Sequence, residues 1–304
     1  MRVQVQVPAT SANLGSAFDT AAVALDLHLH VSATVTGDGG SSVRYQGPQA
    51  ASVPLDRSNL VRRAVVATAK RLSFVAPGLD LEVSSEIPIG VGLGSSAAAV
   101  VAGVLIAAEL AGEQPGVADL LAVAAALEGH PDNAAAALLG GFVVAADTSA
   151  GILTSRVDLP ADLCFVVASP DRPLPTRVAR AVLPDQYNRG DVVSNLQRVA
   201  LLTAAFFAGG EGLRPELFED RLHQEQRSTL VPGLSQSLLL RHPDLLGVFL
   251  SGAGSSVVAV ARHSVETIGA LLEKAFASAG VSCEVRTLGP DNPGALGRLK
   301  AARS

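Results

Sequence analysis

A glycine-rich segment that ends in two serines carries the clearest chemistry of this 304-residue sequence. Residues 88–98 are PIGVGLGSSAA, in which three glycines alternate with apolar residues. Glycines at this spacing allow left-handed backbone and close approach to a ligand, while the alanine-rich residues behind them favour a helix. The N–H groups and the dipole at a helix N-terminus attract anions, so the segment predicts a phosphate-binding loop. The structural alternative is a tight turn with Ser95 as the helix N-cap.

The absence of charge in residues 87–108 raises the alternative of a membrane span. A proline and three glycines occupy the first third of the segment, and the helix that remains at residues 95–110 is too short to cross a bilayer. Other phosphate-binding and nucleophile motifs are excluded. No lysine follows a glycine as in a Walker A loop, Ser95 stands where GxGxxG needs its third glycine, and no GxSxG elbow is present.

The composition excludes several classes of partner. The formal net charge is −5 and no block of basic residues occurs, so nucleic acid and anionic membranes are not expected as partners. The two cysteines, Cys164 and Cys283, lack the spacing of metal ligands, which favours buried reduced thiols and a cytoplasmic location. The first residues alternate polar and apolar like a strand, without the pattern of an export signal.

The apolar periodicity predicts an α+β fold of mixed strands and hairpins rather than a doubly wound parallel sheet. The length favours two domains, with a boundary near residue 155 that gives residues 1–155 and 156–304. A loop rich in Pro, Ser, Asn and Gly is expected after residue 7. Strands are expected at residues 2–7, 23–35, 78–87, 152–157, 163–168, 245–250, 257–261 and 282–288, and helices at 59–72, 95–110, 117–127, 134–141, 176–183, 192–207 and 265–279.

Five segments in the same order resemble a known superfamily. PIGVGLGSSAA resembles the ATP-phosphate motif of the GHMP kinases, and VPATSANLGSAFDT (residues 7–20) resembles the substrate motif of the homoserine kinase family within them. The other three segments are EGHPDNAAAALLGG (128–141), PTRVARAVLP with HQEQRSTLVPG (175–184 and 223–233), and LSGAGSS (250–256). The resemblance implies an N-terminal ATP-binding domain of the ribosomal protein S5 domain 2 type, a ferredoxin-like C-terminal domain, and an active site between them.

The resemblance also implies transfer of the γ-phosphoryl group of ATP to the side-chain hydroxyl of L-homoserine, a step toward threonine. Magnesium would be held by Glu128 with Ser95 or Ser96, because hard oxygen ligands complete a shell that phosphates and water largely supply. The positions that match the family's ATP-binding residues are Asn59, Leu60, Val61, Pro88, Gly90, Gly92, Leu93, Gly94, Ser95, Ser96 and Ala97.

The acceptor site follows from the same resemblance. Arg180 and Arg227 match carboxylate-binding arginines, since a guanidinium can meet a carboxylate bidentately, and Asp19 suits the substrate ammonium. Asp19 and Asn133 are expected to orient the substrate, with Asn133 as the partner of the reacting hydroxyl. The further positions lining the pocket are Asn13, His130 and Asp132. Each assignment has a structural alternative. The arginines could be ordinary surface charges, Asp19 a turn or cap residue, and the Pro-Asp-Asn segment the start of a helix.

Two departures from the family pattern leave alternatives open. Ala17 stands where the family usually has glycine, and Ser255 and Ser256 follow the SGAG loop where Pro-Thr or Pro-Ser is usual. The alternatives are a GHMP kinase for another hydroxylated amino acid or small metabolite, and a non-catalytic paralogue that binds an amino acid or nucleotide. Homodimers are common in the family, so a homodimer is a further expectation.

Overall fold

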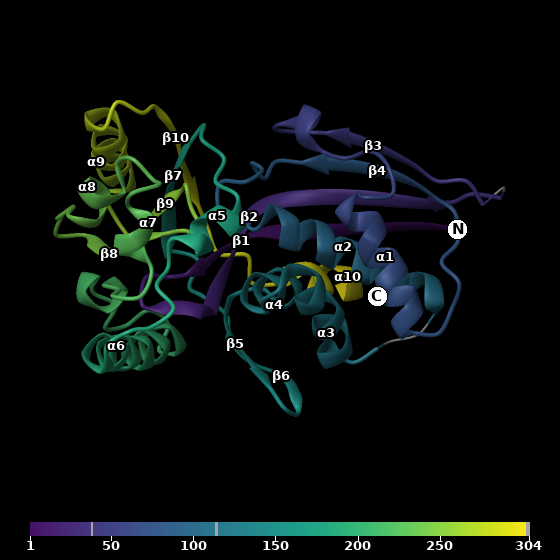
Figure 1. Ribbon diagram of the computed structural model, residues 1–304, viewed down its shortest axis with the longest axis horizontal. Coiled ribbons are helices and arrows are strands. Elements are labelled where there is room, and N and C mark those ends of the chain that lie inside the picture. Colours follow the sequence, from purple (N-terminus) through teal and green to yellow (C-terminus); the bar gives the residue numbers. More distant parts are fainter. Residues whose placement is uncertain (38, 113–114, 302–304) are drawn as a thin grey trace.

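The long strand β2 is the centre of the first sheet in the computed structural model, which describes residues 1–37, 39–112 and 115–301 (Figure 1). β1 pairs antiparallel along one edge of β2, while β4 and β5 pair different stretches of it. β3 joins β4 in parallel and β6 joins β5 antiparallel. The strands are β1 (Arg2–Asn13), β2 (Ala17–Val35), β3 (Ser42–Gln46), β4 (Leu79–Ser85), β5 (Phe142–Thr148) and β6 (Gly151–Val157).

Helices cover one face of this sheet, where the apolar residues that alternate along β1 from Val3 to Val7 are buried. In β1 the side chains of Val3, Val5 and Val7 are buried between the strands and the helix layer. α2 lies in the middle of that layer and is apolar on all sides because it is buried. Among the described helices none is long and apolar enough to span a membrane. The helices are α1 (Leu60–Arg71), α2 (Ser95–Ala111), α3 (Val117–Glu128), α4 (Asp132–Leu139) and α10 (Gly294–Ala301).

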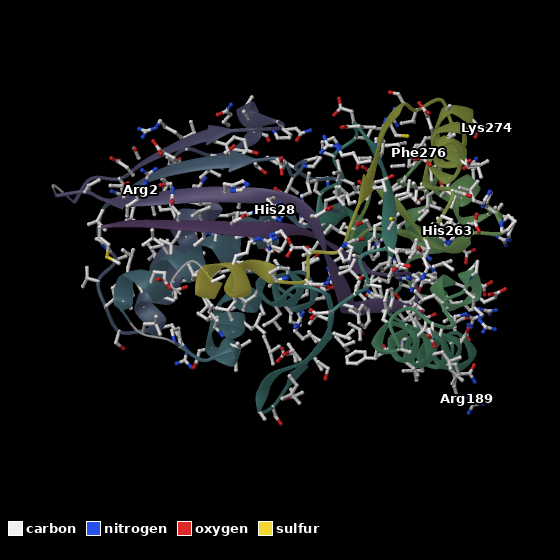
Figure 2. All side chains as sticks on the ribbon, turned by 180° about the vertical axis from the view of Figure 1, so that it is seen from behind. Arg2, His28, Arg189, His263, Lys274 and Phe276 are labelled. Carbon is white, nitrogen blue, oxygen red and sulfur yellow. The ribbon has the colours of Figure 1, made fainter. Side chains whose placement is uncertain are left out.

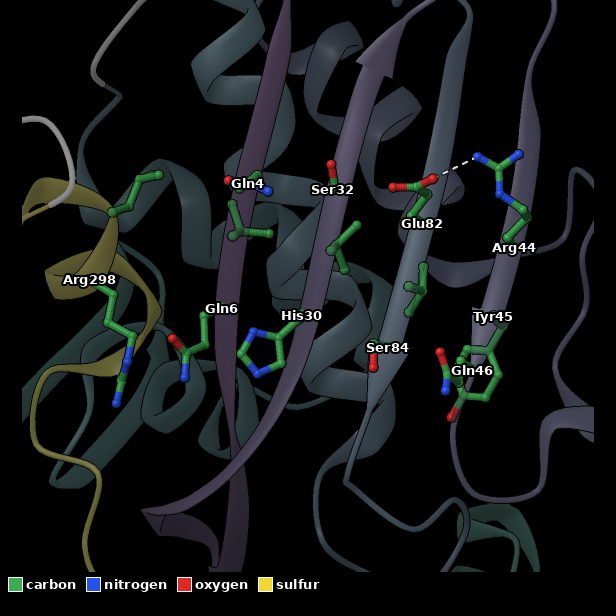
Figure 3. Close-up of a pocket in the computed structure, with 14 residues that line it drawn as sticks. Gln4, Gln6, His30, Ser32, Arg44, Tyr45, Gln46, Glu82, Ser84 and Arg298 are labelled. Carbon is green, nitrogen blue, oxygen red and sulfur yellow. Dashed lines mark hydrogen bonds and ion pairs between the residues drawn. The ribbon is translucent and has the colours of Figure 1, made fainter.

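The opposite face of the first sheet is open and polar, as Figure 3 shows. Gln4, His30 and Glu82 stand in neighbouring strands, and Glu82 pairs with Arg44 of β3 at 2.8 Å. The alternation of apolar and polar residues therefore separates a helix-covered face from an exposed one, as in antiparallel sheets with one solvated side.

The second sheet has the βαββαβ arrangement of a ferredoxin-like domain. Its strands are all antiparallel, in the order β10-β7-β9-β8, and α9 packs against β7 and β10. The strands are β7 (Cys164–Pro170), β8 (Leu245–Leu250), β9 (Val257–Ala261) and β10 (Cys283–Leu288). The helices are α5 (Thr176–Ala181), α6 (Arg189–Phe207), α7 (Gln224–Arg227), α8 (Leu234–Leu238) and α9 (Val265–Ser278), and the short 3-10 turns are η1 (Ala50–Ser52) and η2 (Pro215–Phe218).

One apolar core runs from the first sheet into the second. Phe142 of β5 stacks on Phe206 of α6 with ring centroids 4.3 Å apart, and Phe218 stacks on Phe249 of β8 at 5.6 Å. Phe206 and Phe218 meet edge to face at 6.4 Å, which joins the two stacks. Since these rings belong to both sheets, the two halves of the chain are packed together rather than linked only by the residues between β6 and β7.

The sequence prediction was wrong for residues 8–13, which continue β1 instead of forming a loop. The residues pair with β2 through register shifts at Pro8/Ala9 and Ala12/Asn13, so bulges accommodate the proline. The sequence analysis did not predict β3, β5, α7, α8 or α10. Cys164 and Cys283 are free, as expected, but only partly buried.

The chain that follows β10 returns to the first sheet, beside His28 in Figure 2, and so connects the two sheets. The backbone N–H of Asp291 donates to Ala24 of β2, and its carbonyl accepts from Gly141. Its carboxylate is 2% exposed and accepts from His28 at 2.7 Å and from Arg298 of α10 at 2.6 Å. Burial would raise the pKa of Asp291, but these hydrogen bonds outweigh it and hold the pKa below its usual value.

We expect Asp291→Asn to lower the free energy of unfolding by about 2–4 kcal/mol at neutral pH, because it removes the buried carboxylate that accepts hydrogen bonds from Arg298 and His28. A lowered pKa means that the carboxylate stabilises the fold above its unfolded pKa and loses that effect as the pH falls through the folded value. Urea unfolding at pH 7 and pH 3 measures both effects. The exposed Asp147→Asn is the control, and equal loss in both variants would contradict the role of Asp291.

Candidate active site

A cavity of about 260 Å³ lies where the first sheet, α2 and α4 meet the loops of the C-terminal domain. It brings together predicted residues from segments far apart in the sequence. The predicted residues that line it are Asn13, Asp19, Gly90, Gly92, Leu93, Gly94, Ser95, Ser96, Glu128, His130, Asp132, Asn133, Arg180 and Arg227.

Hydrogen bonds from the C-terminal domain to the loop carbonyls hold the glycine loop in place. The carbonyls of Gly90, Val91 and Gly92 accept hydrogen bonds from Leu174 N, Ser256 N and Ser251 Oγ, all in the C-terminal domain. Gly90, Gly92 and Gly94 all have positive φ, between 69° and 87°. These carbonyls are occupied by hydrogen bonds, and α2 begins at Ser95 in the cavity wall. The first N–H groups of that helix have no partner within the helix and suit an anion.

Ser96 and Glu128 stand side by side at the edge of this loop. Ser96 Oγ donates to Glu128 Oε2 at 2.6 Å, and Glu128 is the last residue of α3. Burial raises the pKa of Glu128, although the hydrogen bond from Ser96 and the charge of His130 act against it. A carboxylate in this position is therefore better stabilised as an anion when a cation lies beside it.

The turn between β1 and β2 places two polar groups against the C-terminal domain. Asn13, Leu14 and Asp19 have positive φ although none is glycine, which is uncommon backbone that the surrounding contacts must hold. Asn13 Nδ2 donates to the carbonyl of Gly252 at 2.8 Å, and Asn13 Oδ1 accepts from the N–H of Asp19 at 3.0 Å. The Asn13 amide therefore fixes the turn and the backbone of Asp19.

The two predicted arginines differ in their surroundings. Arg180 is partly exposed and forms a bidentate ion pair with Asp19, at 2.9 and 2.8 Å. Arg227 is 1% exposed and donates to the carbonyls of Ala179 and Gly252, both at 3.1 Å. Burial, reinforced by the charge of Arg180, lowers the pKa of Arg227 to about 10, so it stays charged at neutral pH. The cavity thus has two cationic groups: Arg227, which is buried and bound to carbonyls, and Arg180, which is paired with Asp19.

Phe18 and His223 belong to this arginine cluster, and the sequence analysis missed both. The Phe18 ring stacks on His223 at 4.9 Å and lies 5.2 Å from the guanidinium carbon of Arg227 and 5.8 Å from that of Arg180. His223 is fully buried, and burial lowers its pKa, so the ring is neutral. Its position four residues before Arg227, in one helical turn, was the only sequence signal.

On the other side of the cavity, a short network begins α4. His130 Nδ1 and Asp132 Oδ1 are 2.7 Å apart, and the N–H of Asn133 donates to the same carboxylate oxygen at 2.6 Å. The hydrogen bond to Asp132 raises the pKa of His130, which burial only partly offsets. These residues therefore start a helix and also line the cavity, while their role with the substrate stays a prediction.

Five predicted ATP-binding residues do not line the cavity. Asn59 is the N-cap of α1, where its Oδ1 accepts from the N–H groups of Val61 and Arg62. Val61 and Ala97 are buried in the core. The residues in question are Asn59, Leu60, Val61, Pro88 and Ala97, and their role with ATP stays a prediction.

A larger hollow of about 800 Å³ lies on the open face of the first sheet (Figure 3). It is lined by polar side chains from β1 to β4 and by Arg298. It contains neither the glycine loop nor the buried arginine, so the smaller cavity between the domains is the candidate active site.

Comparison with known proteins agrees with this geometry. Residues 59–141 match the family model described as "GHMP kinases N terminal domain". A homoserine kinase from Solibacter usitatus is 42% identical over 92% of each chain, and one from Deinococcus radiodurans is 41% identical over 96% of this chain and 95% of its own. The crystal structure of a homoserine kinase from Cytophaga hutchinsonii superimposes with a TM-score of 0.84, at 27% identity over 96% of both chains. The predicted α+β fold is confirmed, and the chain belongs to the homoserine kinase family of the GHMP kinases.

Proposed function

We propose that this chain transfers the γ-phosphoryl group of ATP to the side-chain hydroxyl of L-homoserine and forms O-phospho-L-homoserine. The observation that carries the proposal is a single cavity with a glycine loop on one wall and Asp19, Arg180 and Arg227 on another. The first wall suits phosphates and the second suits an amino-acid zwitterion. Membership of the family supports the same reaction.

The charged groups of the second wall explain how a zwitterion would bind. Asp19 and Arg180 already form an ion pair, in which a carboxylate and a guanidinium satisfy each other. An amino acid offers both charges at once, so its ammonium can take the place of Arg180 at Asp19 while its carboxylate meets Arg180 and Arg227. Binding then exchanges one set of ion pairs for another without leaving a charge unpaired.

Catalysis in this site rests on position and charge rather than on a strong base. The acceptor oxygen forms a bond to the γ-phosphorus, the bond to the bridging oxygen of ADP breaks, and the hydroxyl proton passes to a phosphate oxygen. The N–H groups of the glycine loop would stabilise charge on the moving phosphoryl group. Asn133 and Asp19 orient the acceptor, and neither is required to become a base.

Magnesium is proposed at Ser96 and Glu128, with Ser95 adjacent. The fit rests on two hard oxygens 2.6 Å apart at the edge of the phosphate loop, one of them a carboxylate whose burial raises its pKa. Magnesium usually takes only one or two protein ligands and completes its shell with phosphates and water, and when bound it neutralises phosphate charge. Within the described residues no cluster of three or more His, Cys, Asp or Glu is placed to hold a metal ion.

A coupled assay of ADP release tests the function with ATP and each of homoserine, threonine, serine, mevalonate and galactose. We expect turnover with homoserine at a kcat/KM at least about tenfold above that of any other acceptor. Preferred turnover of another hydroxylated amino acid would replace homoserine as the substrate. Measurable ATP binding with no turnover would identify a non-catalytic binding protein.

Arg180→Ala should raise the KM for homoserine by about 10- to 100-fold and change the KM for ATP by less than about threefold, because a charge-assisted bidentate contact is lost only at the acceptor.

Arg227→Ala should also raise the KM for homoserine and should lower the melting temperature, because it removes a buried side chain that makes three hydrogen bonds. Steady-state kinetics and thermal unfolding measure both. Equal changes in the KM for ATP and for homoserine would contradict the assignment.

We further propose a cytoplasmic homodimer. The free cysteines and the use of ATP support the compartment. One face of α6 supports the dimer, since Leu196 and Leu201 are each 60% exposed and Val192, Val193 and Phe207 are exposed with them. In an antiparallel pair of α6 helices related by a twofold axis near Ala200, these apolar side chains would face those of the second copy, and Arg189 would lie at the outer end of the contact (Figure 2).

Leu196→Glu should therefore halve the mass of the protein in solution, because it places two like charges near the twofold axis of an apolar contact. Sedimentation velocity at micromolar concentration measures the mass. The control is Leu239→Glu, which changes a leucine that is 71% exposed on another surface and should leave the mass unchanged. A monomeric wild type, or a Leu196→Glu variant that is still dimeric, would contradict the α6 interface.

A further inference from the structure

Thr10 of β1 joins the glycine loop to the acceptor side of the cavity, although its side chain is fully buried. Its hydroxyl donates to Asn133 Oδ1 at 2.7 Å, and its backbone N–H donates to the carbonyl of Leu93 at 3.1 Å. A Cβ on Gly94 would lie 1.9 Å from Thr10 Oγ1, so the threonine packs directly against the start of α2. One residue thus touches both the phosphate loop and Asn133.

The contacts of Asn133 determine which way its amide faces. Asp132 Oδ1 accepts from the backbone N–H of Asn133 and lies 2.7 Å from His130 Nδ1. The same oxygen lies 3.4 Å from the side-chain nitrogen Asn133 Nδ2. A carboxylate only accepts hydrogen bonds, so the amide nitrogen belongs on the side of Asp132. The amide oxygen then faces Thr10, whose hydroxyl must be the donor. Asn133 is left with N–H, rather than C=O, to offer to the cavity.

We propose that Thr10 is a positioning residue that fixes the Asn133 amide with its N–H toward the acceptor hydroxyl. This inference rests on the proposed phosphoryl transfer. An N–H donated to the hydroxyl oxygen occupies a lone pair and leaves the hydroxyl proton free to point away from Asn133. As the oxygen–phosphorus bond forms and the bond to ADP breaks, that proton passes to a phosphate oxygen.

The backbone contact of Thr10 gives the same residue a second positioning effect. Because its N–H binds the carbonyl of Leu93, the distance from Asn133 to the glycine loop is set through one rigid strand residue. Hydroxyl and phosphate must approach within about 3–3.5 Å for reaction, so small errors in this distance reduce the rate of the chemical step. The effect should appear in kcat rather than in the binding of either substrate.

Thr10→Val removes the hydroxyl and keeps the shape of the side chain, so it tests the hydrogen bond alone. We expect kcat for homoserine to fall at least about tenfold, with both KM values within about threefold of wild type. Thr10→Ser restores the hydroxyl and should recover kcat to within about threefold. The matched control is Thr68→Val, since Thr68 is equally buried and its hydroxyl bonds the Ala64 carbonyl within α1, away from the cavity.

Several outcomes would overturn the inference: unchanged kcat in Thr10→Val, an equal fall in Thr68→Val, or no recovery in Thr10→Ser. Thr10→Ala replaces Thr10→Val in the same comparison if the valine variant does not fold. An inactive wild type would overturn the proposed function instead, and the inference is then decided by NMR. The side-chain amide signals of Asn133, assigned through their loss in Asn133→Asp, should shift more in Thr10→Val than any other side-chain amide signal, and unchanged signals would overturn the inference.

Discussion

The structure depends on a close approach of three backbone segments that only glycine permits. A Cβ on Gly92 would lie 2.2 Å from the carbonyl oxygen of Ser251, and one on Gly94 would meet Thr10. Both glycines also have positive φ, which L side chains rarely adopt. The glycine loop, the end of β1 and the C-terminal loop are therefore in contact through backbone atoms, and they reach the cavity together. A larger residue at Gly92 would separate the glycine loop from the C-terminal domain, and one at Gly94 would separate it from β1.

This contact also explains why so many polar groups of the site are buried. Ser11 and Ser251 are 2.7 Å apart, and Ser251 donates to Gly92, so a chain of hydroxyls links β1 to the glycine loop. Arg227 and Asn13 both donate to the carbonyl of Gly252. Each buried donor has a partner in another segment, which makes the positions of the segments mutually dependent. The Phe142, Phe206, Phe218 and Phe249 stacks supply the apolar part of the same junction.

The sequence predicts the residues that line the cavity better than the residues that hold them in place. The glycine loop, Glu128 and the two arginines belong to the segments that resemble the family, and the structure brings them to one cavity. Phe18 and Thr10 are ordinary residues whose importance comes from contacts with segments more than a hundred residues away. Residues 8–13 appeared to be a loop because their composition favours turns, yet pairing with β2 outweighs that local preference. Long-range contacts of this kind leave no local pattern in a single sequence.

The contrast between the two arginines suggests how the site selects its acceptor. Arg227 is buried and held by carbonyls, so its position is fixed before substrate arrives. Arg180 is paired with Asp19, and that pair occupies the space where opposite charges of a substrate would bind. A molecule with only a carboxylate would displace Asp19 from Arg180 and leave the aspartate without a cation, and a simple amine would leave Arg180 unpaired. Only a ligand with both charges, such as an amino acid, would compensate both groups, which supports the proposal that the acceptor is a zwitterion.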